Sequence, residues 1–320
     1  MVKESPLVSV IVRTQNRRSL LRDAMHSLWG QTHRPLEILV SNDGGTAIPP
    51  DLQRTETGLE TVVLHSATRR GRSAAANAGL RAARGQFIGF LDDDDLLYEA
   101  HLEKALALLQ SCDKRVGAVY TDLYEAIQVR DTDSPGGYAV KNRSVRYCQV
   151  FDRERLFVDN YIPFNAVLFR RSCLERAGFI DESLDLLEDW DFWIRMALNF
   201  DFVHLCEITG EYGVREDGSN STQELRAQLA PARVHVFQKN APSTLPYLTE
   251  RLRWARRQSP PSVIATTPER IIWLEDQLAE RSREAERMRD RLSRYTNLPM
   301  VALFRRIRSS LLHLPQSIDD

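Results

Sequence analysis

The stretch QFIGFLDDDDLLYEAHL, from Gln86 to Leu102, joins a short apolar run, four consecutive aspartates and a second apolar segment. The run 86–91 predicts a buried strand, and residues 97–111 predict a helix. The simplest interpretation is that Asp94 or Asp95 caps this helix while the other acids are solvated. Four adjacent carboxylates repel one another, however, and a bound cation removes that cost. The position of the acids after a buried strand favours a metal site.

The segments on either side of this stretch predict an α/β fold. Continuous apolar runs indicate strands that are buried on both faces, and helical patterns separate them. The expected strands are 7–12, 36–43, 61–66, 86–91 and 116–122, and the expected helices are 20–31, capped by Ser19, then 72–83 and 97–111. This alternation predicts a mostly parallel central sheet flanked by helices on both faces.

Polar residues follow four of these strands, at Arg13–Arg17, Asn42–Gly44, His65–Arg72 and Asp92–Asp95. In open sheets of this type, ligands bind at the carboxyl ends of the strands. Mg²⁺ and Mn²⁺ prefer a few carboxylates together with substrate phosphates. The sequence therefore predicts a divalent cation that joins the aspartates to a nucleotide diphosphate.

The second half of the chain is less regular. Its expected elements are a polar turn or hairpin at 131–142, a strand at 166–170, a short helix that ends at Gly178, a helix at 186–200 and a strand at 201–215. From about residue 223 the pattern is helical, with interruptions expected at Pro231, Pro242, Pro246 and Pro260–Pro261.

The C-terminal region differs in composition. Residues 268–295 have apolar side chains at three- and four-residue spacing, which predicts a short coiled coil and a homo-oligomer. Residues 300–314 contain three arginines and no acid, and they fit an amphipathic helix on an anionic membrane or a helix packed against protein. The expected domains are a catalytic domain at 1–222, a helical extension at 223–265 and a coiled-coil-like helix with a basic tail at 266–320.

Composition argues against several classes of protein. The net charge of −1 gives no field that favours nucleic acid. No stretch reaches the roughly 18 apolar residues of a membrane span, and the run 7–12 is too short for a secretion signal. We expect a cytoplasmic protein, with peripheral contact at the inner face of the cell membrane as an option for its tail. The cysteines, which lack a CxxC pair, are expected to be reduced thiols in or near the core; they are Cys112, Cys148, Cys173 and Cys206.

Four blocks occur in order along the chain: VSVIVRTQNR, LEILVSNDGG, GRSAAANAGLRAARGQFIGFLDDDD and LLEDWDFWIRM. Together they resemble the family 2 glycosyltransferases with the GT-A fold, over roughly residues 6–217. The resemblance implies inverting, metal-dependent transfer of a hexose from a nucleotide-diphosphate sugar, most often a UDP-sugar, to an acceptor hydroxyl. It also implies a carbohydrate or lipid-linked acceptor in surface polysaccharide or glycolipid biosynthesis.

The resemblance implies donor contacts for polar residues after the strands. Those that match the family blocks are Thr14, Asn16, Arg17, Asp43, Arg72 and Asn77, with Asp43 on the base. The sequence departs from the family pattern at Arg13 (usually proline), Asn42 (usually aspartate), Gly45 (usually serine) and Ala76 (often arginine).

Residues 92–94 resemble the D-x-D motif. The resemblance implies that Asp94 is the most direct metal ligand, that Asp92 is a second ligand, and that Asp92 or Asp93 faces the ribose. Because there are four acids in a row, the register stays open by one position.

Residues 188–191, EDWD, resemble the family's E-D motif, which implies that Asp189, beside Glu188, is the catalytic base. A carboxylate in hydrogen-bond reach of an acceptor hydroxyl can take its proton. Without the resemblance, both acids would simply be favourable in the first turn of a helix. Arg215 is a candidate phosphate contact or a surface residue.

Other enzyme classes fit less well. The loop after the first strand lacks the Gly-rich pattern of a pyrophosphorylase or a dinucleotide-dependent dehydrogenase, and it lacks the aspartate of an aspartyl phosphatase. A non-catalytic, nucleotide-sugar-binding scaffold assembled through its C-terminal helices remains the alternative.

Overall fold

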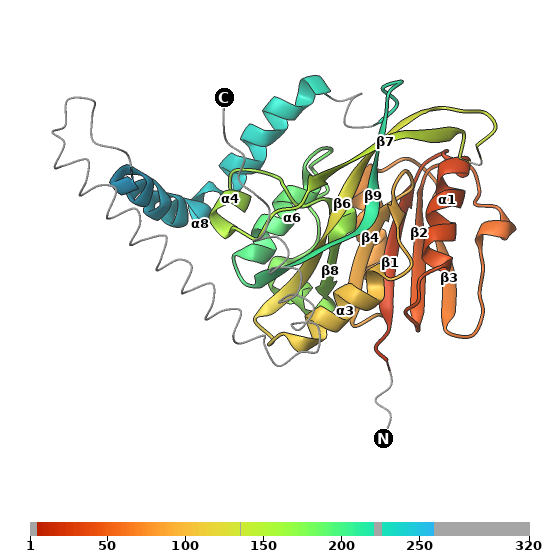
Figure 1. The fold of residues 1–320 in the computed structure, drawn as a ribbon, viewed down its shortest axis with the longest axis horizontal. Helices are drawn as coiled ribbons and strands as arrows, with labels where there is room; N and C mark the ends of the chain where they lie inside the picture. Colours follow the sequence, from red (N-terminus) through yellow and green to blue (C-terminus); the bar gives the residue numbers. More distant parts are fainter. Residues whose placement is uncertain (1–4, 135, 221–225, 259–320) are drawn as a thin grey trace, which may run out of the picture. The chain divides into compact units, whose positions relative to one another are not determined.

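A computed structural model describes residues 5–134, 136–220 and 226–258 of the chain (Figure 1). The chain divides into two units, 1–248 and 249–320, and the first contains the fold described below. The predicted coiled coil at 268–295 and the amphipathic segment at 300–314 lie outside the described residues. The described helices include none that is long and apolar enough to cross a membrane.

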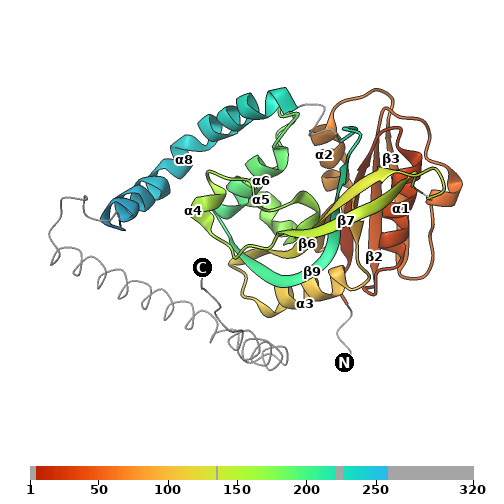
Figure 2. The same ribbon diagram turned by 45° about the horizontal axis from the view of Figure 1, so that its top comes forward.

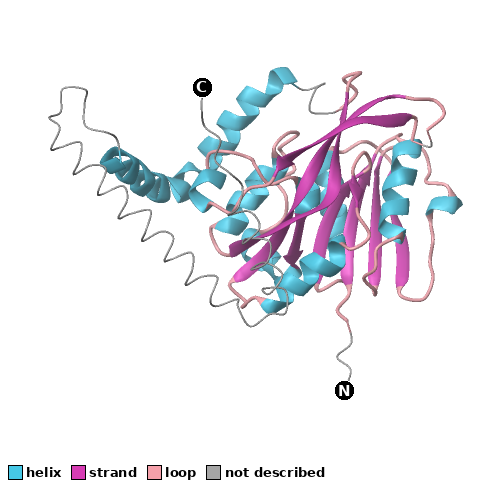
Figure 3. Ribbon diagram, in the orientation of Figure 1, coloured by secondary structure: helices cyan, strands magenta, loops and turns pink. Residues whose placement is uncertain are grey.

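A central sheet of nine strands runs through the first unit (Figure 3). Its order is β3-β2-β1-β4-β8-β6-β9-β5, and β7 pairs with β6. The strands are β1 Val8–Thr14, β2 Leu36–Asp43, β3 Leu59–Ser66, β4 Phe87–Asp92, β5 Leu96–Leu97, β6 Val116–Arg130, β7 Tyr138–Tyr147, β8 Val167–Arg170 and β9 Asp201–Arg215. The pairs β1–β2, β2–β3, β1–β4 and β6–β9 are parallel, as predicted, whereas β5, β7 and β8 pair in the antiparallel direction.

Helices cover both faces of the sheet, and Figure 2 shows α1 and α2 on opposite sides of it. The α-helices are α1 Arg18–Trp29, α2 Arg72–Ala82, α3 His101–Ser111, α4 Arg153–Leu156, α5 Leu174–Ala177, α6 Glu188–Ala197 and α8 Leu229–Gln258. Short 3₁₀ turns lie at Pro50–Leu52, Phe164–Ala166, Arg171–Cys173 and Arg226–Gln228. The α/β fold predicted from the sequence is therefore confirmed.

All seven residues of β1 are buried, which explains why the overlapping run 7–12 is mostly apolar. On one face, Ile11 packs against α2, and the core continues to Phe90, Phe164 and Trp193. The rings of Phe90 and Phe164 stack with their centroids 3.9 Å apart. Burying each such side chain contributes about 1.5–3 kcal/mol, so this core holds the carboxyl ends of β1 and β4 in fixed positions.

The first helix begins at Arg18, so the predicted Ser19 cap is wrong. Arg17 occupies the N-cap position and makes no side-chain cap hydrogen bond. Its guanidinium instead donates to Asp93 and Asp94, at 3.1 and 3.2 Å. The aspartate cluster therefore determines where this arginine points.

The alternative interpretation, in which Asp94 or Asp95 caps the following helix, is also wrong. Residues 96–97 pair with β9 as the short strand β5, and α3 begins at His101. Asp95 accepts a hydrogen bond from the backbone N–H of Gly213, at 2.9 Å. The fourth acid thus fixes β9 to the end of β4 and belongs to the same cluster as the other three.

The helix α8 continues through Pro231, Pro242 and Pro246, so the interruptions predicted there are wrong. Pro231 lies in the first turn, where the missing N–H has no helical partner to lose. The interior prolines cost about 3 kcal/mol each in an isolated helix. Contacts with the core offset part of that cost, and among them Asn240 donates to the buried carboxylate of Asp191 at 2.9 Å.

The prediction of thiols in or near the core is confirmed for Cys112 and Cys173, which are buried. It is wrong for Cys148 and Cys206, which are exposed. All four are free cysteines.

Candidate active site

A cavity of about 680 Å³ lies at the carboxyl ends of β1, β2 and β4. Its walls are polar and carry both acids and arginines, which suits a charged ligand. The lining residues are Arg13, Thr14, Gln15, Arg17, Asp43, Arg69, Arg70, Gly71, Arg72, Ala75, Asp92, Asp93, Asp94, Asp185, Tyr212, Gly213, Asn220 and Gln228. The strand ends that the sequence marked as polar therefore do meet in one place.

The first three aspartates in the cluster all accept hydrogen bonds from arginines. Asp92 accepts two hydrogen bonds from Arg13, both 2.7 Å long. Arg17 donates to both Asp93 and Asp94. Asp94 also accepts a hydrogen bond from Arg215.

Arg215 reaches Asp94 from the end of β9, with Nη1 2.9 Å from the carboxylate. The Arg215 side chain is buried, and Ser219 holds it from behind through its hydroxyl and its carbonyl oxygens. The alternative of a surface arginine is therefore wrong, and Arg215 belongs to the cavity region.

The electrostatics of the cluster differ from one acid to the next. Burial disfavours the charge on Asp92, but Arg13 outweighs burial and lowers the pKa of that carboxyl. Burial, together with the charge of Asp94, raises the pKa of Asp93 to about 7. Burial and the same neighbour raise the pKa of Asp95 well above its usual range. Burial therefore favours the protonated forms of Asp93 and Asp95, and an added cation would favour the ionised forms.

The cluster has the geometry for a divalent cation. Asp92, Asp94 and Asp95 each offer a carboxylate oxygen, and these oxygens lie within 4.8 Å of one another. Hard oxygen ligands of this kind suit Mg²⁺ or Mn²⁺. The remaining acid, Asp93, points instead to Thr14, whose hydroxyl donates to it at 2.7 Å.

Arg13, which departs from the family pattern, joins the aspartate cluster to the start of α6. Its Nη1 donates to Glu188 at 2.7 Å, while Nε and Nη2 hold Asp92. The guanidinium also lies 4.3 Å from the ring centroid of Phe164, as in a cation–π contact. Arg72 makes a parallel link, with its Nε 2.8 Å from Glu188 and Nη2 3.3 Å from Asp92.

Asp189 lies beside this bridge in the first turn of α6. Burial, together with the charge of Glu188, raises its pKa to about 6. The side-chain amide of Asn160 donates to both of its carboxylate oxygens, each at 3.2 Å. Leu187, the residue before the motif, has φ 60° and ψ 24°, a left-handed conformation that is unusual for leucine and typical of functional sites.

Asp43 forms part of the cavity wall and holds a neighbouring loop. Its two carboxylate oxygens accept the backbone N–H groups of Arg70 and Gly71, at 2.7 and 2.9 Å. Gly44 has φ +70°, and a Cβ there would lie 2.3 Å from the backbone nitrogen of Arg69. Only glycine allows the turn after β2 to approach this loop so closely.

Two predicted donor contacts lie away from the cavity lining. Asn16 accepts a hydrogen bond from the backbone N–H of Thr46, at 2.9 Å. Asn77 is buried in α2, donates to the carbonyl of Ile180 and accepts from its N–H. Asn77 therefore fixes the segment that leads to α6, which is a positioning role that spacing along the sequence could not reveal.

The motifs did not reveal every residue of this region. Asn160 comes from an irregular segment whose sequence carries no recognisable pattern, and Gly213 acts through its backbone N–H alone. Arg13 was visible as the first polar residue after the run 7–12 and as a departure from the family. Its position at the end of a buried strand was the available signal, because an arginine buried in a strand needs acidic partners.

The protein combines an α/β sheet with a cavity at its strand ends, an aspartate cluster and a separate acid pair. This combination defines a protein of the GT-A class. The profile of a family described as "Glycosyl transferase family 2" matches residues 9–177. The chain therefore belongs to glycosyl transferase family 2.

Relatives of known sequence agree with this assignment. "Uncharacterized glycosyltransferase YwdF" of Bacillus subtilis is 26% identical over 239 residues, which are 75% of this chain and 86% of the relative. "PGL/p-HBAD biosynthesis glycosyltransferase" of Mycobacterium tuberculosis is 27% identical over 197 residues, which are 61% of this chain and 71% of the relative.

Solved structures agree on the fold. A mannosyltransferase from Pyrobaculum calidifontis, in complex with GDP-Man and Mn²⁺, matches with a TM-score of 0.54 and 20% identity over 86% of this chain and 81% of its own. TarS 1–349 of S. aureus, in complex with UDP, matches with a TM-score of 0.50 and 20% identity over 65% of this chain. The match spans only 60% of that TarS chain.

Proposed function

We propose that the protein is an inverting, metal-dependent glycosyltransferase that moves a hexose from a nucleotide-diphosphate sugar to an acceptor hydroxyl. The observation that carries the proposal is the bridge from Asp92 through Arg13 to Glu188, with contacts of 2.7 Å on each side. It ties the aspartate cluster to the acid pair at the start of α6. A donor bound at the cluster would then present its sugar near this pair.

In the proposed reaction, the acceptor oxygen attacks the anomeric carbon while the bond from that carbon to the diphosphate oxygen breaks. The acceptor proton passes to the carboxylate of Asp189, which Asn160 orients. Thr14, Arg17, Asp43, Arg72 and Asp93 line the donor side of the cavity. Mg²⁺ or Mn²⁺, held by Asp92, Asp94 and Asp95, would supply positive charge against the departing diphosphate.

The donor is proposed to be a UDP-sugar, and the acceptor a carbohydrate or lipid-linked precursor of a surface polysaccharide or glycolipid. The proposal of a UDP-sugar donor rests on the family resemblance and on the UDP bound in the TarS complex. The GDP-Man of the Pyrobaculum enzyme makes GDP donors the second class to examine. The mycobacterial relative, whose name refers to PGL/p-HBAD biosynthesis, supports a precursor of a surface glycolipid.

The direct test is release of nucleoside diphosphate from a panel of UDP-, GDP- and dTDP-sugars, with and without Mn²⁺. We expect one donor class to be turned over, and we expect Asp94→Ala and Asp189→Ala each to abolish transfer while circular dichroism shows an intact fold. Donor binding without turnover under any condition would favour the alternative of a non-catalytic nucleotide-sugar-binding protein. Transfer that persists in Asp189→Ala would refute the assignment of the base.

A further inference from the structure

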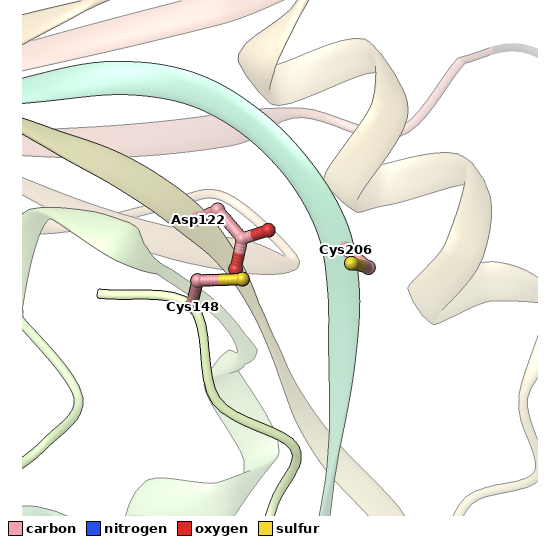
Figure 4. A group of neighbouring side chains, drawn as sticks. All are labelled: Asp122, Cys148 and Cys206. Carbon is pink, nitrogen blue, oxygen red and sulfur yellow. The ribbon is translucent and has the colours of Figure 1, made fainter. Parts of the chain in front are cut away.

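Two exposed cysteines and a buried aspartate form a second cluster, outside the cavity described above (Figure 4). Asp122 lies on β6, Cys206 on β9, and Cys148 directly after β7. The carboxylate oxygen and the two sulfur atoms all lie within 4.8 Å of one another. Three residues far apart in sequence thus bring three metal-binding atoms together.

Irregularities in both strand pairs around Asp122 create this arrangement. Between β6 and β9, Thr121 pairs with Leu205 but Asp122 pairs with Ile208, which leaves Cys206 and Glu207 as extra residues. This is a β-bulge, and bulges commonly redirect a side chain at a functional site. The bulge places Cys206 beside Asp122.

On the other side, the pairing of β6 with β7 shifts between Leu123 and Tyr124, which leaves Arg146 as an extra residue of the β7 backbone. Leu123 pairs with Tyr147, so the next step of this antiparallel register sets Cys148 opposite Asp122. Two independent departures from regular pairing therefore converge on the same aspartate.

Residues behind the cluster hold it in place. His204 lies two positions before Cys206 on the same face of β9, and its Nε2 is 2.5 Å from Oδ1 of Asp122. The His204 ring stacks on Tyr120 at 4.9 Å, and the Tyr120 hydroxyl donates to the carbonyl of Gln149, next to Cys148. Carboxylates that bind metals are commonly oriented by a hydrogen bond from a neighbouring side chain, and His204 can supply one to Asp122.

We propose that Cys148, Cys206 and Asp122 form a binding site for a zinc-type divalent cation, with a solvent molecule as the fourth ligand. Two thiolates and one carboxylate suit Zn²⁺, which takes sulfur, nitrogen and oxygen ligands in tetrahedral geometry. The three ligand atoms lie within 4.8 Å of one another, so they are close enough to share one ion at zinc distances of about 2.0–2.3 Å after small side-chain adjustments. Both cysteines are exposed residues, which gives the ion a route from solvent.

Burial, together with the nearby charge of Asp122, raises the pKa of Cys148 and raises that of Cys206 to about 11. Without a cation both thiols therefore stay protonated at neutral pH. Binding of the metal would release these protons, as it does wherever thiols become ligands.

The ion would join β6, β9 and the segment after β7 at one point. The same β9 continues to Gly213 and Arg215, which contact Asp95 and Asp94 of the first cluster. The site is therefore assigned a structural role in the half of the sheet that carries these two contacts. It does not depend on the proposed glycosyl transfer.

The test is titration of the reduced, chelator-treated full chain with Co²⁺, followed by displacement with Zn²⁺. We expect one equivalent of Co²⁺ to give a thiolate-to-cobalt charge-transfer band that Zn²⁺ abolishes, and we expect Zn²⁺ to raise the Tm. Cys148→Ser and Cys206→Ser should each remove the band and the Tm rise. His204→Gln should keep the band but weaken Co²⁺ binding by about 10–100-fold.

Asp94→Ala is the matched control, because cobalt bound at an all-oxygen site gives no thiolate band; this variant should retain the full signal. Circular dichroism of the serine variants without metal checks that they fold. A wild-type protein without the charge-transfer band would overturn the proposal. So would a band that survives in both serine variants, or formation of a Cys148–Cys206 disulfide in air at the same rate with and without Zn²⁺.

Discussion

Nη1 of Arg13 lies 2.7 Å from the carboxylate of Glu188, although the two residues are 175 positions apart in the chain. The same guanidinium holds Asp92 through two further bonds of 2.7 Å. Each of the three nitrogen atoms of one buried guanidinium is thus used to connect the end of β4 with the start of α6. Neither end of this bridge can move without the other.

Removal of that arginine should destabilise the fold. In Arg13→Met, Asp92 and Glu188 each lose one buried ion pair and keep their pairs with Arg72, and breaking a buried ion pair costs about 3–5 kcal/mol. We expect a loss of this size in the free energy of unfolding, measured by urea denaturation at pH 7. Arg54→Met is the control, because its pair with Glu56 is about half exposed and should contribute about 0–1 kcal/mol.

This difference should depend on pH. The folded-state pKa of Asp92 is lowered, so its contribution to stability is present above the ordinary aspartate pKa and is lost as the pH falls through the folded value. The gap between wild type and Arg13→Met should therefore shrink on acidification. A gap that stays constant down to strongly acidic pH would argue against the Asp92 partnership.

Under the proposed function, in which Asp189 is the catalytic base, activity should depend on pH through this residue. A catalytic base must be ionised, and the pKa of this carboxyl is raised to about 6, so kcat/KM should be level near pH 8 and fall about tenfold per pH unit below that pKa. Asp189→Asn should lower kcat by about 10²–10⁴-fold and remove this acid limb from the residual rate. A residual rate that keeps the same limb would assign the pH dependence to another group.

Gly79 in α2 should resist replacement by alanine, although alanine is usually the better helix former. A Cβ at this position would lie 2.4 Å from Cγ2 of Ile11 and 2.8 Å from Cγ1, inside the packed core beneath β1. We expect Gly79→Ala to lower the free energy of unfolding by about 1–3 kcal/mol, as overpacking does. Gly30→Ala is the control, because the nearest atom to its Cβ is 3.4 Å away; equal losses in both variants would exclude the steric explanation.

The C-terminal segments are predicted to promote self-association and membrane contact. Apolar spacing in 268–295 favours self-association, and the basic, apolar segment 300–314 favours contact with anionic membranes. A chain that ends at residue 265 should therefore be monomeric by light scattering and should no longer sediment with anionic vesicles. A mass unchanged from that of the full chain would refute the first half, and undiminished sedimentation would refute the second.

The sequence predicted the elements that depend on local pattern. The parallel strands of the first half follow from continuous apolar runs, and the meeting of the polar strand ends follows from the topology of such sheets. The roles of individual side chains were harder to predict. Asn77 matched a motif but anchors Ile180, and Cys148 and Cys206 became neighbours only through two register shifts. Contacts of this kind depend on pairing between distant segments, about which spacing along one chain says nothing.

The arginines around the aspartate cluster have a consequence for how the site would fill. Arg17 and Arg215 occupy the carboxylate of Asp94 that a cation would need. Under the proposed function, the phosphate oxygens of the donor can accept hydrogen bonds from these arginines. The cation can then bind the aspartates that the arginines release. The negative charge of the diphosphate and the positive charge of the divalent ion cancel, so loading is an electroneutral exchange of partners. Donor and cation should then enter cooperatively, each strengthening the binding of the other.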